Sequence, residues 1–85
     1  MEQSFVGIDV AKDRLDIHVR PSGESFALAR DGEGLAALVD RLKQIAPVLI
    51  VLEATGGFEI TLAAAVGAAG LPLAVVNPPR RYEPA

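Results

Sequence analysis

The chain is 85 residues long, which is below the usual size of a protein domain, so it can form one compact unit at most. Eleven acidic and eight basic residues give a net charge of -3, which argues against binding nucleic acid by bulk electrostatic attraction. The absence of cysteine excludes disulfides and thiolate metal sites, and a single histidine cannot form a histidine cluster.

Hydrophobic residues make up 51% of the chain. This share is high for so short a chain, since a small domain has proportionally more surface and needs more polar residues to cover it. We expect some of this apolar surface to face a partner, either the rest of a longer polypeptide or a second copy. The amino terminus has no secretory signal pattern. The apolar stretch 60–76 is shorter than the roughly 20 residues of a membrane helix and contains two glycines and a proline, so we expect no membrane segment. The absence of cysteine fits a reducing compartment, so we expect a cytoplasmic location.

The first third of the chain has the pattern of three strands. Residues 4–10 form a short apolar run that ends in the polar residues 11–13, as expected for a buried strand entering a turn. Apolar and polar residues alternate strictly over 14–20, which is typical of a strand with one face in solvent. Turn-forming residues occupy 21–24, and apolar residues at period two over 25–30 predict a third strand. We therefore expect an antiparallel meander.

The remaining residues alternate between helix and strand patterns. Asp31 is a suitable cap for a helix whose apolar residues recur at helical spacing and which ends before Pro47. The continuous aliphatic and β-branched run 48–52 predicts a strand buried on both faces. The alanine-rich residues 58–69 predict a second helix, with a glycine positioned to cap it, and residues 71–76 predict a last strand.

The predicted order of elements is therefore β-β-β-α-β-α-β. Right-handed crossovers after the meander give a mixed five-stranded sheet of order 3-2-1-4-5, in which strands four and five run parallel to the first. This is the topology of the ribonuclease-H-like α/β fold. Both crossovers advance in the same direction, so both helices must cover one face of the sheet. Because strands one and four are apolar in both phases, we expect missing C-terminal helices, a dimer partner or both to cover the other face.

Two acidic residues are the strongest candidates for a functional site. Asp9 ends the first predicted strand and Glu53 ends the fourth. Parallel neighbours lie about 4.8 Å apart, so the two carboxylates can converge where open α/β sheets bind ligands. A divalent cation relieves their repulsion, and Mg²⁺ prefers oxygen ligands while it keeps several waters. The residues alone leave a structural alternative open, in which Asp9 accepts backbone hydrogen bonds in a turn and Glu53 starts a helix.

Three motifs carry a resemblance to a known family. They are VGIDVAK at residues 6–12, LEATGG at 52–57 and VVNP at 75–78, with Leu15 and Asp16 close to the first motif. Together they resemble the DEDD transposases of the insertion-sequence-110 family over nearly the whole chain. The resemblance implies a RuvC-like domain whose Asp-Glu-Asp-Asp set binds Mg²⁺. Members of that family are bacterial or archaeal recombinases that move DNA under the direction of an element-encoded structured RNA.

The resemblance also indicates which acidic residues belong to the family's set and which parts of the family's proteins have no counterpart in this chain. Asp9 matches the first Asp of the set and Glu53 matches the Glu, while the two later Asp residues and the family's C-terminal domain with its serine nucleophile have no counterpart. Residues 1–85 are therefore expected to be the amino-terminal portion of one RuvC-like domain, incomplete at the C-terminus and inactive alone. As part of the full-length protein, this portion would use Mg²⁺ or Mn²⁺, bind DNA and guide RNA, and form a homo-oligomer.

Basic residues and a glycine pair are weaker candidates for nucleic-acid contacts. Lys12 and Arg14 near the first turn, with Arg80 and Arg81 at the tail, could bind phosphate. The glycine pair 56–57 before a helix could offer backbone donors to an anion. Isolated basic side chains are more often simply solvated, and paired glycines more often serve a tight turn.

Two other interpretations of the sequence stay open. Actin-like ATPases and sugar kinases also begin with a strand ending in Gly-Ile-Asp, but a phosphate loop rich in glycine and hydroxyl residues usually follows, where this chain has Val10, Ala11 and Lys12. The chain could also be a non-catalytic dimerisation module, in which the uncovered sheet face pairs subunits and the acids are incidental. His18 lies among charged residues on a predicted solvent face, and we assign it no role.

Overall fold

A computed structural model describes residues 3–53 and 56–76. Within these ranges the elements are β1 (Phe5–Val10), β2 (Arg14–Arg20), β3 (Ser25–Ala29), α1 (Gly32–Ile45), β4 (Leu49–Glu53), α2 (Glu59–Ala68) and β5 (Leu73–Val76). The order β-β-β-α-β-α-β predicted from the sequence is confirmed. No helix among these residues is long and apolar enough to cross a membrane.

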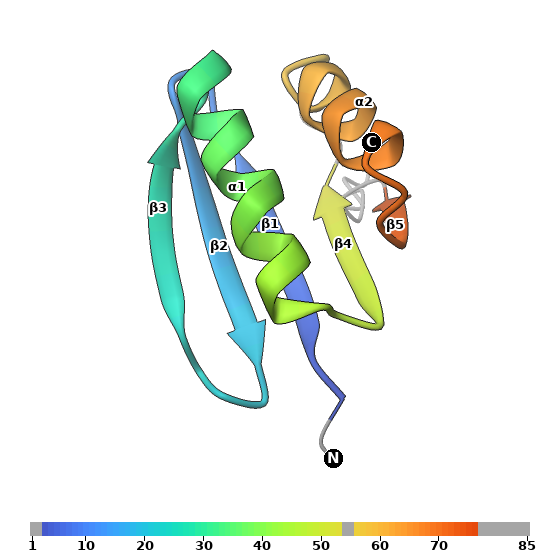
Figure 1. The fold of residues 1–85 in the computed structure, drawn as a ribbon. Coiled ribbons are helices and arrows are strands. Elements are labelled where there is room, and N and C mark those ends of the chain that lie inside the picture. The colour runs from blue at the N-terminus through green and yellow to red at the C-terminus, as the bar shows by residue number, and fades with distance from the viewer. Residues whose placement is uncertain (1–2, 54–55, 77–85) are drawn as a thin grey trace, which may run out of the picture.

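The strands form one mixed sheet in the order β3-β2-β1-β4-β5 (Figure 1). The pairs β1–β2 and β2–β3 are antiparallel, whereas β1–β4 and β4–β5 are parallel. In the register of the central parallel pair, Phe5 lies beside Leu49 and Ile8 beside Leu52. This is the ribonuclease-H-like arrangement, and its predicted strand order 3-2-1-4-5 is confirmed.

Both helices lie on the same face of the sheet (Figure 1), as the handedness of the two crossovers requires. The core is formed between that face and the helices by Val6, Ile8, Val10, Leu15, Ile17, Val19, Leu38, Leu42, Ile50, Leu52, Leu62 and Val66. The alternate strand residues point to the opposite face, which no described element covers, and we call it the bare face. Its exposed residues include Phe5, which retains 46% of its accessible surface.

The end of α1 agrees with the predicted bound, and the end of α2 explains why the last strand begins later than predicted. Ala46 ends α1 in a left-handed conformation with φ 51°, directly before Pro47. At the end of α2, Gly70 has φ 74° and its N–H donates to the Gly67 carbonyl, while the Leu71 N–H donates to the Val66 carbonyl. These two bonds form a Schellman motif. The last strand therefore begins at Leu73 instead of residue 71, because Leu71 belongs to the helix cap.

The start of α1 lies tightly against the end of β3. The Asp31 side chain accepts a hydrogen bond of 2.7 Å from the Gly34 N–H, which confirms Asp31 as the helix cap. Gly34 itself is buried, and a Cβ at this position would lie 1.7 Å from the Ala29 carbonyl oxygen. Only glycine allows the helix to approach the strand this closely. A Cβ at Gly32, in the same helical turn, would meet nothing within 4 Å.

We expect Gly34→Ala to lower the free energy of unfolding by about 1 to 3 kcal/mol, the usual range for overpacking, because the new methyl group would overlap backbone. Gly32→Ala is the matched control, since it makes the same change where space is open and gains up to about 1 kcal/mol of helix propensity. Urea denaturation followed by circular dichroism measures both. Equal stability of the two variants would show that α1 can move away from β3 without loss.

Candidate functional site

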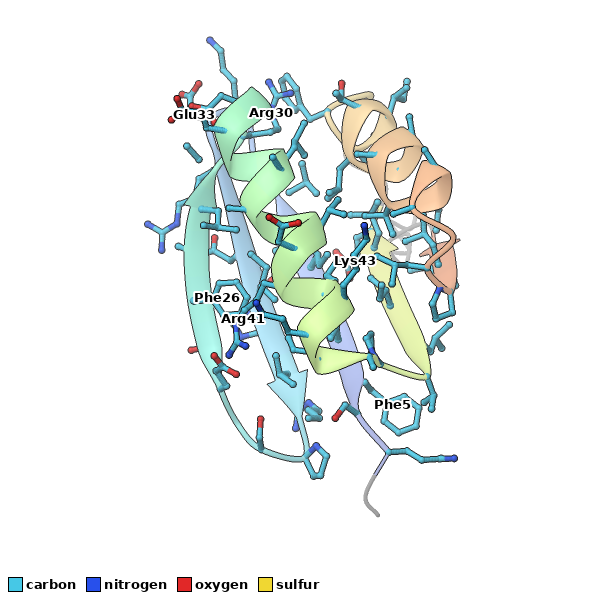
Figure 2. All side chains as sticks on the ribbon, in the orientation of Figure 1. Phe5, Phe26, Arg30, Glu33, Arg41 and Lys43 are labelled. Atoms are coloured by element: carbon cyan, nitrogen blue, oxygen red, sulfur yellow. The ribbon has the colours of Figure 1, made fainter. Side chains whose placement is uncertain are left out.

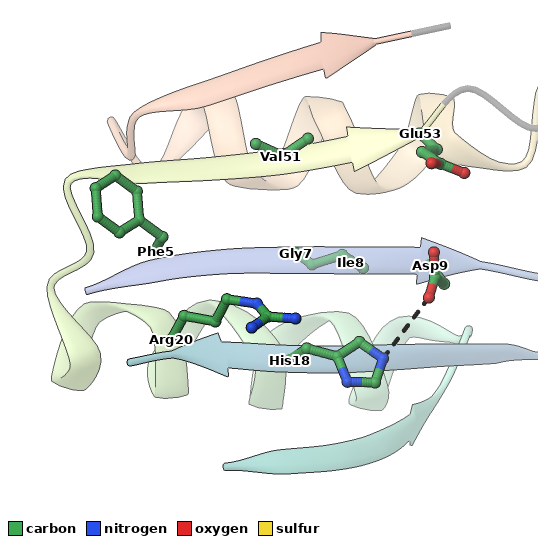
Figure 3. Close-up of a pocket in the computed structure, with 8 residues that line it drawn as sticks. All are labelled: Phe5, Gly7, Ile8, Asp9, His18, Arg20, Val51 and Glu53. Carbon is green, nitrogen blue, oxygen red and sulfur yellow. Dashed lines mark ion pairs between the residues drawn. The ribbon is translucent and has the colours of Figure 1, made fainter. Parts of the chain in front are cut away.

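Asp9 and Glu53 lie at the same end of two neighbouring parallel strands. Asp9 is near the end of β1 and Glu53 is the last residue of β4. Their preceding neighbours, Ile8 and Leu52, are paired in the ladder and almost fully buried, at 2% and 0% exposure. Because strand residues alternate between faces, both carboxylates must point to the bare face. Figure 3 shows them at the same end of the sheet on adjacent strands.

An open groove with a volume of about 340 Å³ crosses the bare face. It is lined by Phe5, Gly7, Ile8, Asp9, His18, Arg20, Val51 and Glu53. Phe5 lies at one end of the groove and the two carboxylates at the other, with His18 and Arg20 along β2 (Figure 3). Gly7 lies in the groove between Phe5 and the carboxylates, and the space above it is open, because a Cβ there would meet nothing within 4 Å.

Charged side chains surround Asp9 on its β2 side. Asp16 is its direct cross-strand partner. The charge of Asp16 is offset by Arg14, whose guanidinium nitrogens lie 2.8 and 2.9 Å from the Asp16 Oδ1. The His18 Nε2 lies 3.6 Å from the Asp9 Oδ2, and both side chains are more than half exposed. Glu53, Asp9 and Asp16 therefore form a row of carboxylates across three adjacent strands.

The basic residues predicted to contact nucleic acid fall into two groups. Lys12 and Arg14 are exposed in and just after the turn that follows β1, at the same end of the sheet as the two carboxylates. Arg14 uses its guanidinium to pair with Asp16 while 65% of its side chain stays accessible. Arg80 and Arg81 lie outside the described residues.

The glycine pair before α2 forms a tight turn. Gly56 and Gly57 have φ values of 73° and 116°, a region that favours glycine. The Gly57 N–H donates to both carboxylate oxygens of Glu59, at 3.2 and 3.0 Å. The Gly57 backbone donor is therefore satisfied within the chain. Sequence reasoning had not singled out Glu59, although an acidic residue in the first helical turn is the usual signal for such a contact.

The donor types at this end of the sheet suit a hard divalent cation. Carboxylate oxygens are the ligands that Mg²⁺ prefers, and Mg²⁺ keeps several waters when it binds through one or two carboxylates. Across residues 3–53 and 56–76, no group of three or more histidine or acidic side chains is placed to hold a metal ion. The described part of the chain thus places two carboxylates, Asp9 and Glu53, on adjacent strands without a third acidic or histidine side chain that completes such a group.

Without a cation, the row of carboxylates should cost stability. We expect Asp9→Asn to raise the free energy of unfolding by roughly 0.2 to 0.5 kcal/mol in a low-salt buffer with chelator, because Asp9 lies between two side chains of the same charge. Asp13→Asn is the control, since Asp13 is an exposed turn residue outside the row. Urea denaturation at two salt concentrations measures the effect, which added salt should reduce. A loss of stability in Asp9→Asn would mean that its contact with His18 outweighs the repulsion.

Comparisons with known proteins agree with this fold. The structure of T. thermophilus RuvC in complex with a Holliday junction substrate is similar, with a TM-score of 0.69 and 14% sequence identity. The match covers 91% of this chain and 66% of that RuvC chain, so the chain spans less than two thirds of its length. Identity this low supports a shared fold and no more. A search of curated proteins gave no match.

The family comparison extends over almost the entire sequence. The sequence model of the DEDD transposases of the insertion-sequence-110 family, described as a transposase, matches residues 6–83. This range contains both carboxylates and all but the first residue of the seven described elements. The chain therefore belongs to the insertion-sequence-110 family of DEDD transposases.

Proposed function

We propose that this chain is the amino-terminal part of a RuvC-like transposase that cleaves and rejoins the DNA strands of an insertion sequence. The observation that carries the proposal is the placement of Asp9 and Glu53 on adjacent parallel strands, at the same end and on the same face. Family membership supports the reaction class. The likeness to RuvC supports the fold on which the two carboxylates are arranged.

In this proposal Asp9 and Glu53 hold Mg²⁺ or Mn²⁺. The bound ion would activate a water or hydroxyl and stabilise the leaving oxygen of a phosphodiester. The chain's own contribution is to fix two carboxylates on a rigid sheet, where Ile8 and Leu52 anchor the strands in the core directly before them. Further ligands must come from outside the described residues, since these contain no group of three suitable side chains. We therefore propose that the 85-residue chain is inactive alone.

The proposed partners of the full-length protein are DNA, an element-encoded guide RNA and further copies of the protein. With a net charge of -3, contact with nucleic acid must depend on local basic groups. Lys12 and Arg14 are suitable for phosphate contacts because they follow β1 at the end of the sheet that carries the carboxylates. We keep Arg80 and Arg81 as candidates on the sequence alone.

The geometry favours this proposal over a nucleotide-binding alternative. The turn after β1 is short, and the Ala11 N–H donates to the Arg14 carbonyl at 2.8 Å to close it. A phosphate-binding loop needs several backbone donors turned towards the ligand, usually supplied by glycine and hydroxyl residues. In this chain the turn returns directly into β2.

We expect Mg²⁺ or Mn²⁺ to raise the melting temperature of the wild-type chain by several degrees. A cation at tenfold excess over its Kd would add about 1.4 kcal/mol of stability if it binds only the folded chain. Asp9→Asn and Glu53→Gln should each remove most of this gain, because each replaces a charged ligand by an amide of nearly the same size. Differential scanning calorimetry with and without each cation measures the shift.

Asp13→Asn is the matched control for these melts, because it removes an exposed acidic charge close to β1 without touching the pair. It should keep the full cation response. Stabilisation that survives both Asp9→Asn and Glu53→Gln would count against a metal site at these residues. Indifference of the wild-type chain to both cations would favour the non-catalytic dimerisation module instead.

A further inference from the structure

Arg30 connects three segments at the end of the sheet that carries the two carboxylates. It directly follows β3, and its backbone N–H donates to the Asp13 carbonyl at 3.2 Å. Its side-chain Nε donates to the Lys12 carbonyl at 2.5 Å. The guanidinium carbon also lies 4.9 Å from the centre of the Phe58 ring, which is a cation–π contact. Figure 2 shows Arg30 at this end of the sheet, beside the start of α1.

These contacts lie just beyond the two candidate ligands. Lys12 belongs to the turn that comes after Asp9, and Phe58 is the cap residue of α2, the next element after Glu53. One guanidinium therefore joins the segment after β1 to the start of the helix after β4. The two joined residues are far apart in the sequence, so local structure alone does not keep them together.

The pairing between β1 and β4 stops before it reaches the two carboxylates. Its residue pairs end with Ile8 and Leu52, one residue before Asp9 and Glu53 on each strand. Asp9 is still paired with Asp16 on β2, and Glu53 with Val76 on β5, so each acid is held by its outer neighbour and not by the other acid's strand. The spacing of the two carboxylates therefore depends on how far β1 and β4 diverge past their last pair. Arg30 is placed where it can limit their divergence, since it links the turn after β1 to the start of α2.

We propose that Arg30 is a positioning residue that keeps Asp9 and Glu53 at the separation a shared cation requires. This inference rests on the proposed metal-binding role of the two carboxylates. The planar guanidinium suits the task because it donates to a carbonyl while its face covers an aromatic ring. A lysine ammonium is a compact point charge, which cannot satisfy both contacts with the same geometry.

The test is a Mn²⁺ titration of the ¹⁵N-labelled 85-residue chain, followed by paramagnetic broadening of the backbone amide signals of Asp9 and Glu53. The wild-type chain should show both signals broadening together at one apparent affinity. Arg30→Ala should weaken that affinity by about tenfold, the lower end of the range for residues that orient metal ligands.

Two milder variants keep the test decisive if Arg30→Ala fails to fold. Arg30→Lys keeps the charge and should restore part of the affinity. Phe58→Leu removes the ring but keeps the bond to the Lys12 carbonyl, and should cost roughly two- to threefold, less than loss of the guanidinium. Melting temperatures in chelator, measured for each variant, separate a change in affinity from a loss of folded protein.

Arg41→Ala is the matched control. Arg41 also makes a cation–π contact, 5.8 Å from the Phe26 ring centre, and an ion pair with Glu24, but it lies towards the opposite end of the sheet (Figure 2). It should leave the Mn²⁺ affinity unchanged. Unchanged affinity in a folded Arg30→Ala or Arg30→Lys chain, or an equal loss in Arg41→Ala, would overturn the positioning role alone. Absence of broadening at Asp9 and Glu53 in the wild-type chain would overturn the proposed metal site, and the positioning role with it.

Discussion

The parallel pairing of β1 with β4 is the constraint on which the rest of the structure depends. It brings the carboxyl ends of two strands from distant parts of the chain to one edge of the sheet. The two-residue period of each strand then decides the face, because Ile8 and Leu52 are buried beneath the helices and the next residue on each strand must point away from them. A slip of one residue in either strand would bury an acid and expose a core side chain. The stability of the core and the placement of the two acids therefore depend on the same register.

Much of this could be predicted from the sequence, because the decisive signals are local and periodic. Strict alternation from Arg14 to Arg20 indicated both the strand and its buried face, and Pro47 marked the end of α1. The handedness of crossovers then limited the topology to one arrangement with both helices on one face. Asp9 and Glu53 could be found for the same reason, since each comes directly after apolar residues of a buried strand.

The contacts that could not be predicted are those that join residues without a shared period or motif. Nothing near Arg30 in the sequence points to the Phe58 ring, and their meeting depends on how far α2 reaches across the end of the sheet. Gly34 looks like an unfavourable residue in a helix until the Ala29 carbonyl is seen beneath it. The sequence also did not predict that the Gly57 N–H donates to the Glu59 carboxylate within the same turn. Side-chain reach and close backbone approach are properties of the assembled fold.

The long sequence separation between the paired strands has a consequence for how the molecule is assembled. β1, β2 and β3 are connected by short turns, so their antiparallel pairing requires little loop closure and can form early. The β1–β4 pair can form only after the chain from β2 to the end of α1 has been made, because parallel strands require a crossover. During synthesis the first strand therefore emerges with Asp9 well before its counterpart exists. The two acids can be brought together only once β4 has been made, so a nascent chain would pass through a stage with a partly built sheet in which Asp9 has no acidic neighbour on β4.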